Sequence, residues 1–116
     1  MRVLLADDQL KVRSALCLLL EQEPNFQVVG ETADATGLLL AVAEKTPDLV
    51  LLDWELPGLP AAQLVRLLQY ERPSLKIIAM SSRPEVERLV LDAGAHAFLS
   101  KSDLPERVLA IIRSLL

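Results

Sequence analysis

The sequence is poor in cysteine, positive charge and long apolar runs, and each shortage excludes a class of protein. The single cysteine, Cys17, allows no internal disulfide, and the chain starts without a basic and apolar leader, so a cytoplasmic location is expected. Twelve basic against 16 acidic residues give a net charge of −4, which argues against direct nucleic-acid binding, because phosphate contacts need clustered Lys and Arg. No apolar run reaches the ~20 residues of a membrane span.

What the sequence does contain is enough apolar material for one core. With 116 residues and 52% hydrophobic content, residues 1–116 are predicted to form a single domain without repeats or linkers. Five short apolar runs alternate with longer amphipathic segments, and the predicted strands are Arg2–Ala6, Gln27–Gly30, Leu49–Leu52, Lys76–Met80 and Ala97–Ser100. Because these runs are apolar on both faces, they predict a doubly wound α/β fold with a parallel sheet.

Prolines and polar capping residues mark the expected helix boundaries. Prolines at 47 and 73 are expected to close the second and third helices. The predicted N-terminal capping residues are Asp8, Asp34, Ser82 before Pro84, and Ser102 or Asp103 before Pro105.

Acidic residues follow two strands that should be neighbours. Ligands of such folds bind outside the carboxyl ends of the strands. Asp7 and Asp8 follow the first strand and Asp53 follows the third, and with the strand order 2-1-3-4-5 these strands lie about 4.8 Å apart. Three carboxylates in one small volume need a cation, and an all-oxygen site suits Mg²⁺. Each aspartate taken alone could equally be a helix N-cap.

Two further polar residues follow the fourth and fifth strands. Ser81 supplies a hydroxyl and Lys101 an ammonium to the same edge of the sheet, and helix capping does not explain a lysine there. A carboxylate nucleophile, a metal, a hydroxyl and an ammonium together match the requirements of phosphoryl transfer.

At the motifs ADDQ, LLDWELPG, AMSS and FLSKS, the sequence resembles the receiver domain of two-component response regulators. The resemblance covers the chain from Val3 to the last helix and implies the flavodoxin-like, CheY-like (βα)5 fold. The VVGE stretch, and a lysine not followed by proline, resemble the NarL/LuxR-type subgroup. The implied activity is phosphorylation of Asp53 by a histidine kinase or phosphotransfer protein, and the implied metal ligands are Asp7, Asp8, Asp53 and the backbone carbonyl of Glu55, which would hold Mg²⁺.

The resemblance also implies a conformational switch. Ser81 would hydrogen-bond the phosphoryl group, Lys101 would pair with another of its oxygens, and Phe98 would be the switch aromatic, with a plain core role as the alternative. The implied output is transcription regulation by a DNA-binding domain that this chain lacks, because it contains no helix-turn-helix pattern.

Some residues depart from the family pattern. Ser102 stands where proline usually follows the lysine, which leaves the conformation of the Lys101–Ser102 peptide open. Ser82 is larger than the usual Ala or Gly and predicts slower entry of phosphodonors. Glu55 and Arg83 occupy positions that tend to set the lifetime of the phosphoryl group, and they could pair across the mouth of the site.

The apolar surplus of the first and last helices predicts an exposed patch. Such a patch often marks an interface, and the resemblance implies a possible homodimer through the first and fifth helices, or through the face of the fourth helix, fifth strand and fifth helix; a larger core is the alternative. His96 is expected to be neither a metal ligand nor a phosphate carrier.

Two other functions compete with the receiver. A Mg²⁺-dependent aspartyl-phosphate phosphohydrolase would need a substrate cap, for which this short chain has no insertion. A dinucleotide-binding domain is disfavoured by the lack of G-x-G-x-x-G after the first strand. Beyond self-phosphorylation from small donors and auto-dephosphorylation, no enzymatic activity is expected.

Overall fold

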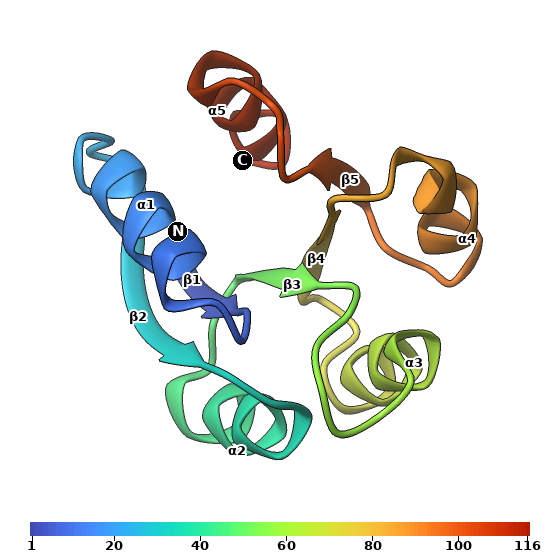
Figure 1. Cartoon of the computed structure of the whole chain (residues 1–116). Coiled ribbons are helices and arrows are strands. Elements are labelled where there is room, and N and C mark those ends of the chain that lie inside the picture. Colours follow the sequence, from blue (N-terminus) through green and yellow to red (C-terminus); the bar gives the residue numbers. More distant parts are fainter.

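Five parallel strands form one sheet in the computed structural model, which describes all 116 residues. The strands are β1 (Arg2–Ala6), β2 (Gln27–Thr32), β3 (Leu49–Asp53), β4 (Lys76–Ser81) and β5 (Ala97–Ser100). Their order is β2-β1-β3-β4-β5, which confirms the predicted fold class and strand order (Figure 1). Three strands run one or two residues past their predicted ends, because the polar residues that follow each apolar run still pair with the neighbouring strand.

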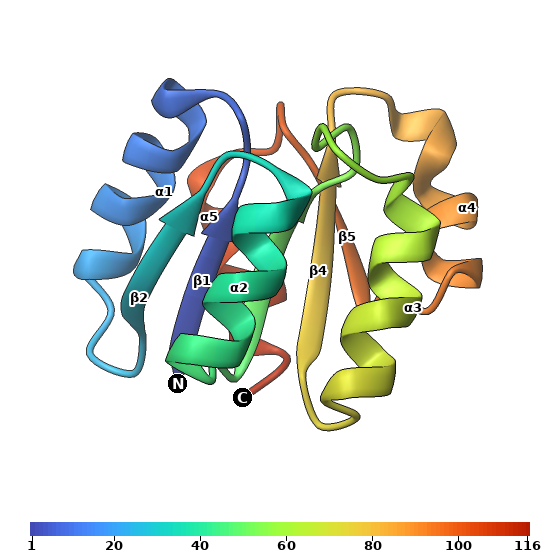
Figure 2. The same ribbon diagram turned by 90° about the horizontal axis from the view of Figure 1, so that it is seen from below.

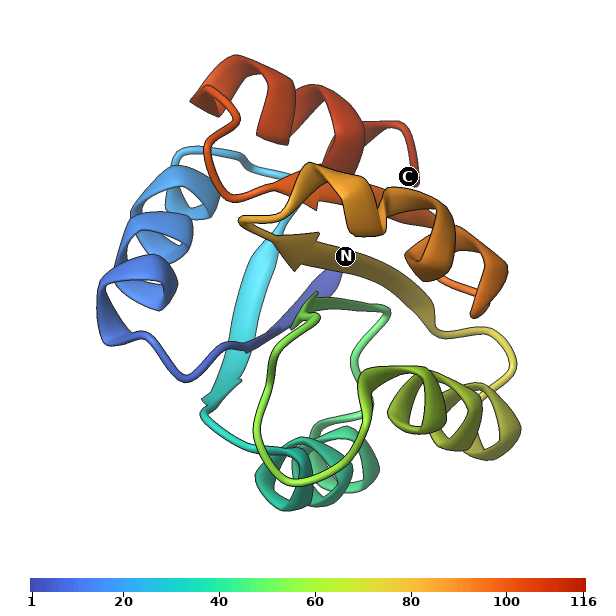
Figure 3. The same cartoon turned by 45° about the vertical axis from the view of Figure 1, so that its right-hand side comes forward.

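Helices cover both faces of the sheet (Figures 1 and 3). They are α1 (Leu10–Glu21), α2 (Ala35–Lys45), α3 (Ala61–Glu71), a 3₁₀ turn η1 (Pro84–Val86) leading into α4 (Glu87–Asp92), and α5 (Pro105–Arg113). As Figure 1 shows, α1 and α5 lie on one face, and α2, α3 and α4 on the other. Both termini lie at the end of the sheet where the strands begin (Figure 2). None of these helices has the length and apolar character that a bilayer span requires.

The alternation of side chains along each strand divides the core into two layers. In β1, Val3 and Leu5 belong to the layer under α1 and α5, whereas Leu4 and Ala6 belong to the layer under α2, α3 and α4. All five residues of β3 are buried. The strands are therefore apolar on both faces because both faces are covered, as the sequence predicts.

The predicted helix caps hold only in part. Asp34 caps α2, since its Oδ1 accepts a hydrogen bond from the Gly37 N–H at 2.7 Å. The prediction for Asp8 was wrong, because Gln9 is the N-cap of α1 and its side chain makes no capping bond.

Prolines mark the remaining helix starts and ends. Neither Ser82 nor residues 102–103 cap a helix; η1 and α5 instead begin at Pro84 and Pro105, whose fixed φ suits the first helical position. The ends of α2 and α3 precede Pro47 and Pro73, as predicted.

The loop after β3 depends on a glycine. Gly58 has a φ of +118°, and a Cβ at this position would lie 3.0 Å from the Cβ of Ala35 and 3.3 Å from its backbone nitrogen. That nitrogen donates to the Pro57 carbonyl at 2.9 Å, which ties the loop to the start of α2. The segment that follows Asp53 is held in place by this close approach.

Replacing Gly58 by alanine is expected to lower the free energy of unfolding by about 1–3 kcal/mol, because the new Cβ meets backbone and the φ is unfavourable for an L residue. Urea unfolding measures the change. Ser74→Ala, in an exposed turn before β4, is the control and is expected to stay within about 0.5 kcal/mol of the parent. A parent-like Gly58→Ala would contradict this account of the loop.

Candidate functional site

Three aspartates meet at the carboxyl ends of β1 and β3. One carboxylate oxygen from each of Asp7, Asp8 and Asp53 lies within 4.8 Å of the others. Asp7 is fully buried and Asp53 is 1% exposed, whereas Asp8 is open to solvent. The convergence predicted from the strand order is therefore present, and it follows from the direct pairing of β1 with β3.

Backbone groups orient the two buried carboxylates. Asp7 Oδ1 accepts the N–H of Gln9 at 2.8 Å, and Asp53 Oδ1 accepts the N–H of Glu55 at 3.0 Å. The backbone N–H of Asp7 donates in turn to the Thr32 carbonyl of β2 at 3.0 Å. Each carboxylate is thus fixed by its own loop as well as by its strand.

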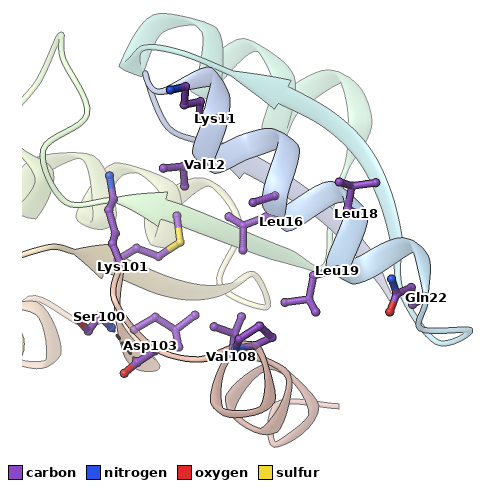
Figure 4. Close-up of a pocket in the computed structure, with 14 residues that line it drawn as sticks. Lys11, Val12, Leu16, Leu18, Leu19, Gln22, Ser100, Lys101, Asp103 and Val108 are labelled. Carbon is purple, nitrogen blue, oxygen red and sulfur yellow. Dashed lines mark hydrogen bonds between the residues drawn. The ribbon is translucent and has the colours of Figure 1, made fainter.

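Lys101 reaches this acidic cluster from the segment that follows β5. Its Nζ lies 2.8 Å from Asp7 Oδ2 and 3.3 Å from Asp53 Oδ1, and its side chain is only 15% exposed. Figure 4 shows the side chain extending away from α5. The chain has no cis peptide bond, so the Lys101–Ser102 peptide is trans and the lysine reaches the site without a proline behind it. Its backbone N–H donates to the Ser81 carbonyl at 2.9 Å, which anchors the loop to β4.

Burial and neighbouring charges shift the pKa values of two of these groups. Burial, with a smaller contribution from the charge of Asp7, raises the pKa of Asp53 to about 6, although the Glu55 N–H and Lys101 act in the opposite direction. Burial alone would lower the pKa of Lys101, but the hydrogen bond and ion pair with Asp7 and the charge of Asp53 hold it above its ordinary value. Asp53 is thus a carboxylate that is costly to ionise in the folded protein.

The donor set at this edge fits a hard divalent cation. Three carboxylates face a single ammonium, so the cluster keeps a surplus of negative charge. Asp7 Oδ2 is buried and receives no hydrogen bond of regular geometry, despite the nearby Lys101, which leaves lone pairs available. All three side chains offer oxygen, the ligand that Mg²⁺ prefers.

Ser81 lies beside the cluster in a hydrogen-bond network that the sequence predicted only in part. Its buried hydroxyl donates to Glu55 Oε1 at 2.9 Å and accepts the N–H of Arg83 at 3.0 Å. Arg83 Nη2 lies 3.5 Å from Glu55 Oε2, so the predicted pairing of these two residues is present. Glu55, two positions after Asp53, was the signal in the sequence for this network. Its hydrogen bond to Ser81 could not be predicted, because it depends on the distance between the loops that follow β3 and β4.

The other residues singled out by the sequence occupy less central places. Ser82 is exposed next to Ser81. Phe98 is partly buried, packs against the core layer under α2, α3 and α4, and pairs with Ala79 across β4 and β5. His96 accepts the N–H of Ile77 through Nδ1 at 3.1 Å, at the start of β5 and therefore at the opposite end of this strand from Lys101.

A basic residue near the acidic cluster was missed. Arg13 of α1 donates from Nη1 to the backbone carbonyl of Asp7 at 2.5 Å. An arginine within the mostly apolar α1 was the only sequence signal for this contact.

An apolar hollow of about 490 Å³ lies between α1 and α5 (Figure 4). Val12, Leu16 and Leu19 of α1 and Val108 of α5 line it, and the stem of Lys101 closes one end. Leu18 beside it is 64% exposed, so part of the apolar surplus of α1 faces outward, as predicted.

Comparisons with known proteins agree on one family. Residues 3–113 match the family model of the response regulator receiver domain. The chain is 36% identical over 118 residues to the transcriptional activator protein ExaE of Pseudomonas putida, covering 100% of this chain and 55% of ExaE. The chain thus spans about half the length of the curated relatives it matches.

Solved structures give the same result. A LuxR-family two-component response regulator from Aurantimonas superimposes with a TM-score of 0.90 at 28% identity, over 98% of this chain and 83% of that one. RcsB from Salmonella enterica, bound to the promoter rprA in the presence of the phosphomimetic BeF₃⁻, gives a TM-score of 0.91 at 27% identity, over 99% of this chain and 61% of RcsB.

The pKa of Asp53 predicts a pH-dependent effect on stability. Because the folded-state pKa of about 6 lies above the ordinary value of 3.8, the folded protein holds this proton more tightly, and the free energy of unfolding falls as pH rises through this range. Asp53→Asn lacks this titration. The quantity to compare is the free energy of unfolding of Asp53→Asn minus that of the parent, measured in EDTA. This difference should be about 2–3 kcal/mol larger at pH 8 than at pH 4.

Urea unfolding at the two pH values measures this difference, with Asp92→Asn on the exposed face of α4 as the control. A stability difference between Asp53→Asn and the parent that does not change with pH would contradict the shifted pKa.

Proposed function

This chain belongs to the response regulator receiver domain family of two-component systems, and from that membership we propose that it is switched by phosphorylation of Asp53. The observation that carries the proposal is the placement of Asp53, buried at the end of β3 beside Asp7, Asp8 and Lys101. The phosphoryl donor would be the phosphohistidine of a histidine kinase or of a phosphotransfer protein.

The chemistry is an in-line transfer to a carboxylate. An ionised oxygen of Asp53 attacks the phosphorus, the phosphorus–nitrogen bond of the donor breaks, and an acyl phosphate forms on Asp53. Lys101, 3.3 Å from Asp53 Oδ1, is placed to pair with a phosphoryl oxygen. Mg²⁺ held by Asp7, Asp8, Asp53 and the backbone carbonyl of Glu55 would neutralise charge on the phosphoryl oxygens.

The switch begins at Ser81. Its hydroxyl donates to Glu55 in the unmodified protein, and the phosphoryl oxygens would compete with Glu55 for that hydrogen bond. Movement of Ser81 would carry the segment into η1 and α4 with it, which lets Phe98 change its packing. Shifting the ratio of active to inactive conformation from about 1:99 to 99:1 requires contacts that favour the active conformation by about 5.5 kcal/mol. A few charge-assisted hydrogen bonds at roughly 1.5–3 kcal/mol each can supply this energy.

Three residues around the mouth of the site would tune the reaction. Glu55 and Arg83 lie 3.5 Å apart and shield the Ser81 side of the site, where they would hinder the attack of water on the acyl phosphate. Ser82, exposed beside them, would slow the entry of small phosphodonors.

The proposed output is transcription regulation through a DNA-binding domain outside this chain, in the cytoplasm, without nucleic-acid binding by the receiver itself. Relatives such as ExaE, which extend well beyond the matched region, support this part of the proposal. A homodimer would form through α1 and α5, where the hollow and Leu18 offer apolar surface, or through α4, β5 and α5, where Leu89 is exposed.

The first test of this function follows Trp54, the only tryptophan, which is adjacent to Asp53. Addition of Mg²⁺ and then of beryllofluoride, a mimic of the acyl phosphate, should change its fluorescence in the parent, and acetyl phosphate should add one phosphoryl group. Asp53→Asn should lose both the response to beryllofluoride and the phosphorylation. A parent that shows neither would overturn the proposal, and repeated turnover of small phosphate esters would favour a hydrolase.

A second test addresses the pairing of Glu55 with Arg83. Arg83→Ala should accelerate loss of the phosphoryl group by up to about fivefold, because an exposed ion pair contributes about 0.2–1 kcal/mol. The decay of phosphorylated protein after removal of the donor measures the rate. Arg88→Ala, which breaks the exposed pair with Asp92 on α4, is the matched control and should leave the rate unchanged. An equal rate in parent and Arg83→Ala would remove this pair from the mechanism.

A further inference from the structure

Arg13 of α1 is a largely buried cation that contacts the backbone of the acidic cluster. Its side chain is only 16% exposed. Nη1 donates to the Asp7 carbonyl at 2.5 Å, and Nε donates to Glu31 Oε1 at 3.1 Å. The guanidinium therefore joins three elements, the end of β1, the end of β2 and the first turns of α1.

The Asp7 carbonyl depends on this contact. Asp7 lies in the connection between β1 and α1, and no backbone N–H donates to its carbonyl oxygen, because α1 begins only at Leu10. The N–H groups in the first turn of α1 do not donate to the Asp7 carbonyl, because Val12 and Arg13 both donate to the Gln9 carbonyl instead. A buried carbonyl without a donor is costly, so Arg13 supplies what the helix does not.

Arg13 also completes the set of bonds that orient Asp7. The Asp7 N–H donates to the Thr32 carbonyl at 3.0 Å, its Oδ1 accepts from Gln9, and its carbonyl accepts from Arg13. The last of these bonds holds the peptide that joins Asp7 to Asp8. Rotation of that peptide would move Asp8, the most exposed of the three carboxylates, away from Asp7 and Asp53.

We propose that Arg13 is a positioning residue for the cation site, which holds the Asp7–Asp8 peptide so that both carboxylates face Asp53. Glu31 fixes the guanidinium from β2, and the planar fork of arginine is what allows both contacts at once. This inference rests on the proposed function, because it assumes that the three aspartates bind Mg²⁺.

Arg13 could act on the cation site through its charge or by holding the peptide in place. The two roles predict opposite changes in Mg²⁺ affinity when Arg13 is replaced. A positive charge near the cluster opposes the binding of a cation, so removal of charge alone would tighten Mg²⁺ binding. Loss of a group that orients a ligand weakens metal binding, typically about tenfold or more. The sign of the change in Mg²⁺ affinity therefore separates the two roles.

The experiment compares Arg13→Gln, which loses the charge, with Arg13→Lys, which keeps the charge but not the fork. Mg²⁺ is titrated into the 116-residue chain and binding is followed by calorimetry and by Trp54 fluorescence. We expect both variants to bind Mg²⁺ about tenfold more weakly than the parent. Arg88→Gln, an exposed arginine on α4, controls for net charge and should bind as the parent does.

Urea unfolding without metal establishes that each variant is folded. If Arg13→Gln does not fold, Arg13→Lys alone decides, because a merely structural arginine would lower stability without changing the Mg²⁺ affinity of the folded fraction. A folded variant that binds Mg²⁺ as tightly as the parent, or more tightly, overturns this inference. A parent that binds no Mg²⁺ overturns the proposed metal site itself, so the two failures are distinguishable.

Discussion

The mutual repulsion of three carboxylates at one edge of the sheet is the constraint on which the rest of the structure depends. The pairing of β1 with β3 forces Asp7, Asp8 and Asp53 together, and burial removes the solvent that would screen Asp7 and Asp53, while Asp8 stays open to solvent. One ammonium, from Lys101, compensates only part of this charge. The folded chain thus holds a site that is incomplete electrostatically and suited to a divalent cation and a transferred phosphoryl group.

The same constraint explains why the neighbouring loops are tied so closely. Lys101 contacts two carboxylates from a loop whose backbone is bonded to the carbonyl of Ser81, and the Ser81 hydroxyl is in turn bonded to Glu55 from the loop after β3. A new anion on Asp53 would disturb both contacts at once. The hydroxyl of Ser81 has one proton to donate, so a bond to a phosphoryl oxygen must replace its bond to Glu55. Under the proposed phosphorylation, this exchange of one acceptor for another would give the edge two alternative arrangements.

Residues whose roles follow from position along a strand could be predicted from the sequence. The contacts of Arg13 with Glu31 and of Ser81 with Glu55 were not predicted, because they depend on the distance between two elements in space. The apolar strands predicted the sheet, and the polar residues at their ends predicted Asp53 and Lys101 as neighbours. Arg13 and Glu31, 18 positions apart, meet only because β2 lies beside β1. Asp8 was expected to cap α1, but the chain uses the preceding residue, Asp7, to accept the N–H of Gln9, and Asp8 stays free.

The position of α1 connects the acidic cluster with the outer surface. Its inward side carries Arg13, which bonds the Asp7 carbonyl, and its outward side carries Leu18 beside the hollow toward α5. If two copies associate through α1, and association shifts this helix relative to β1, then the peptide between Asp7 and Asp8 shifts with it. By thermodynamic linkage, a cation or phosphoryl group that binds the dimer more tightly must then strengthen dimerisation by the same factor. The hydrogen bond from Arg13 to the Asp7 carbonyl would be a direct physical route for that coupling, because it joins the helix to a proposed ligand of the cation.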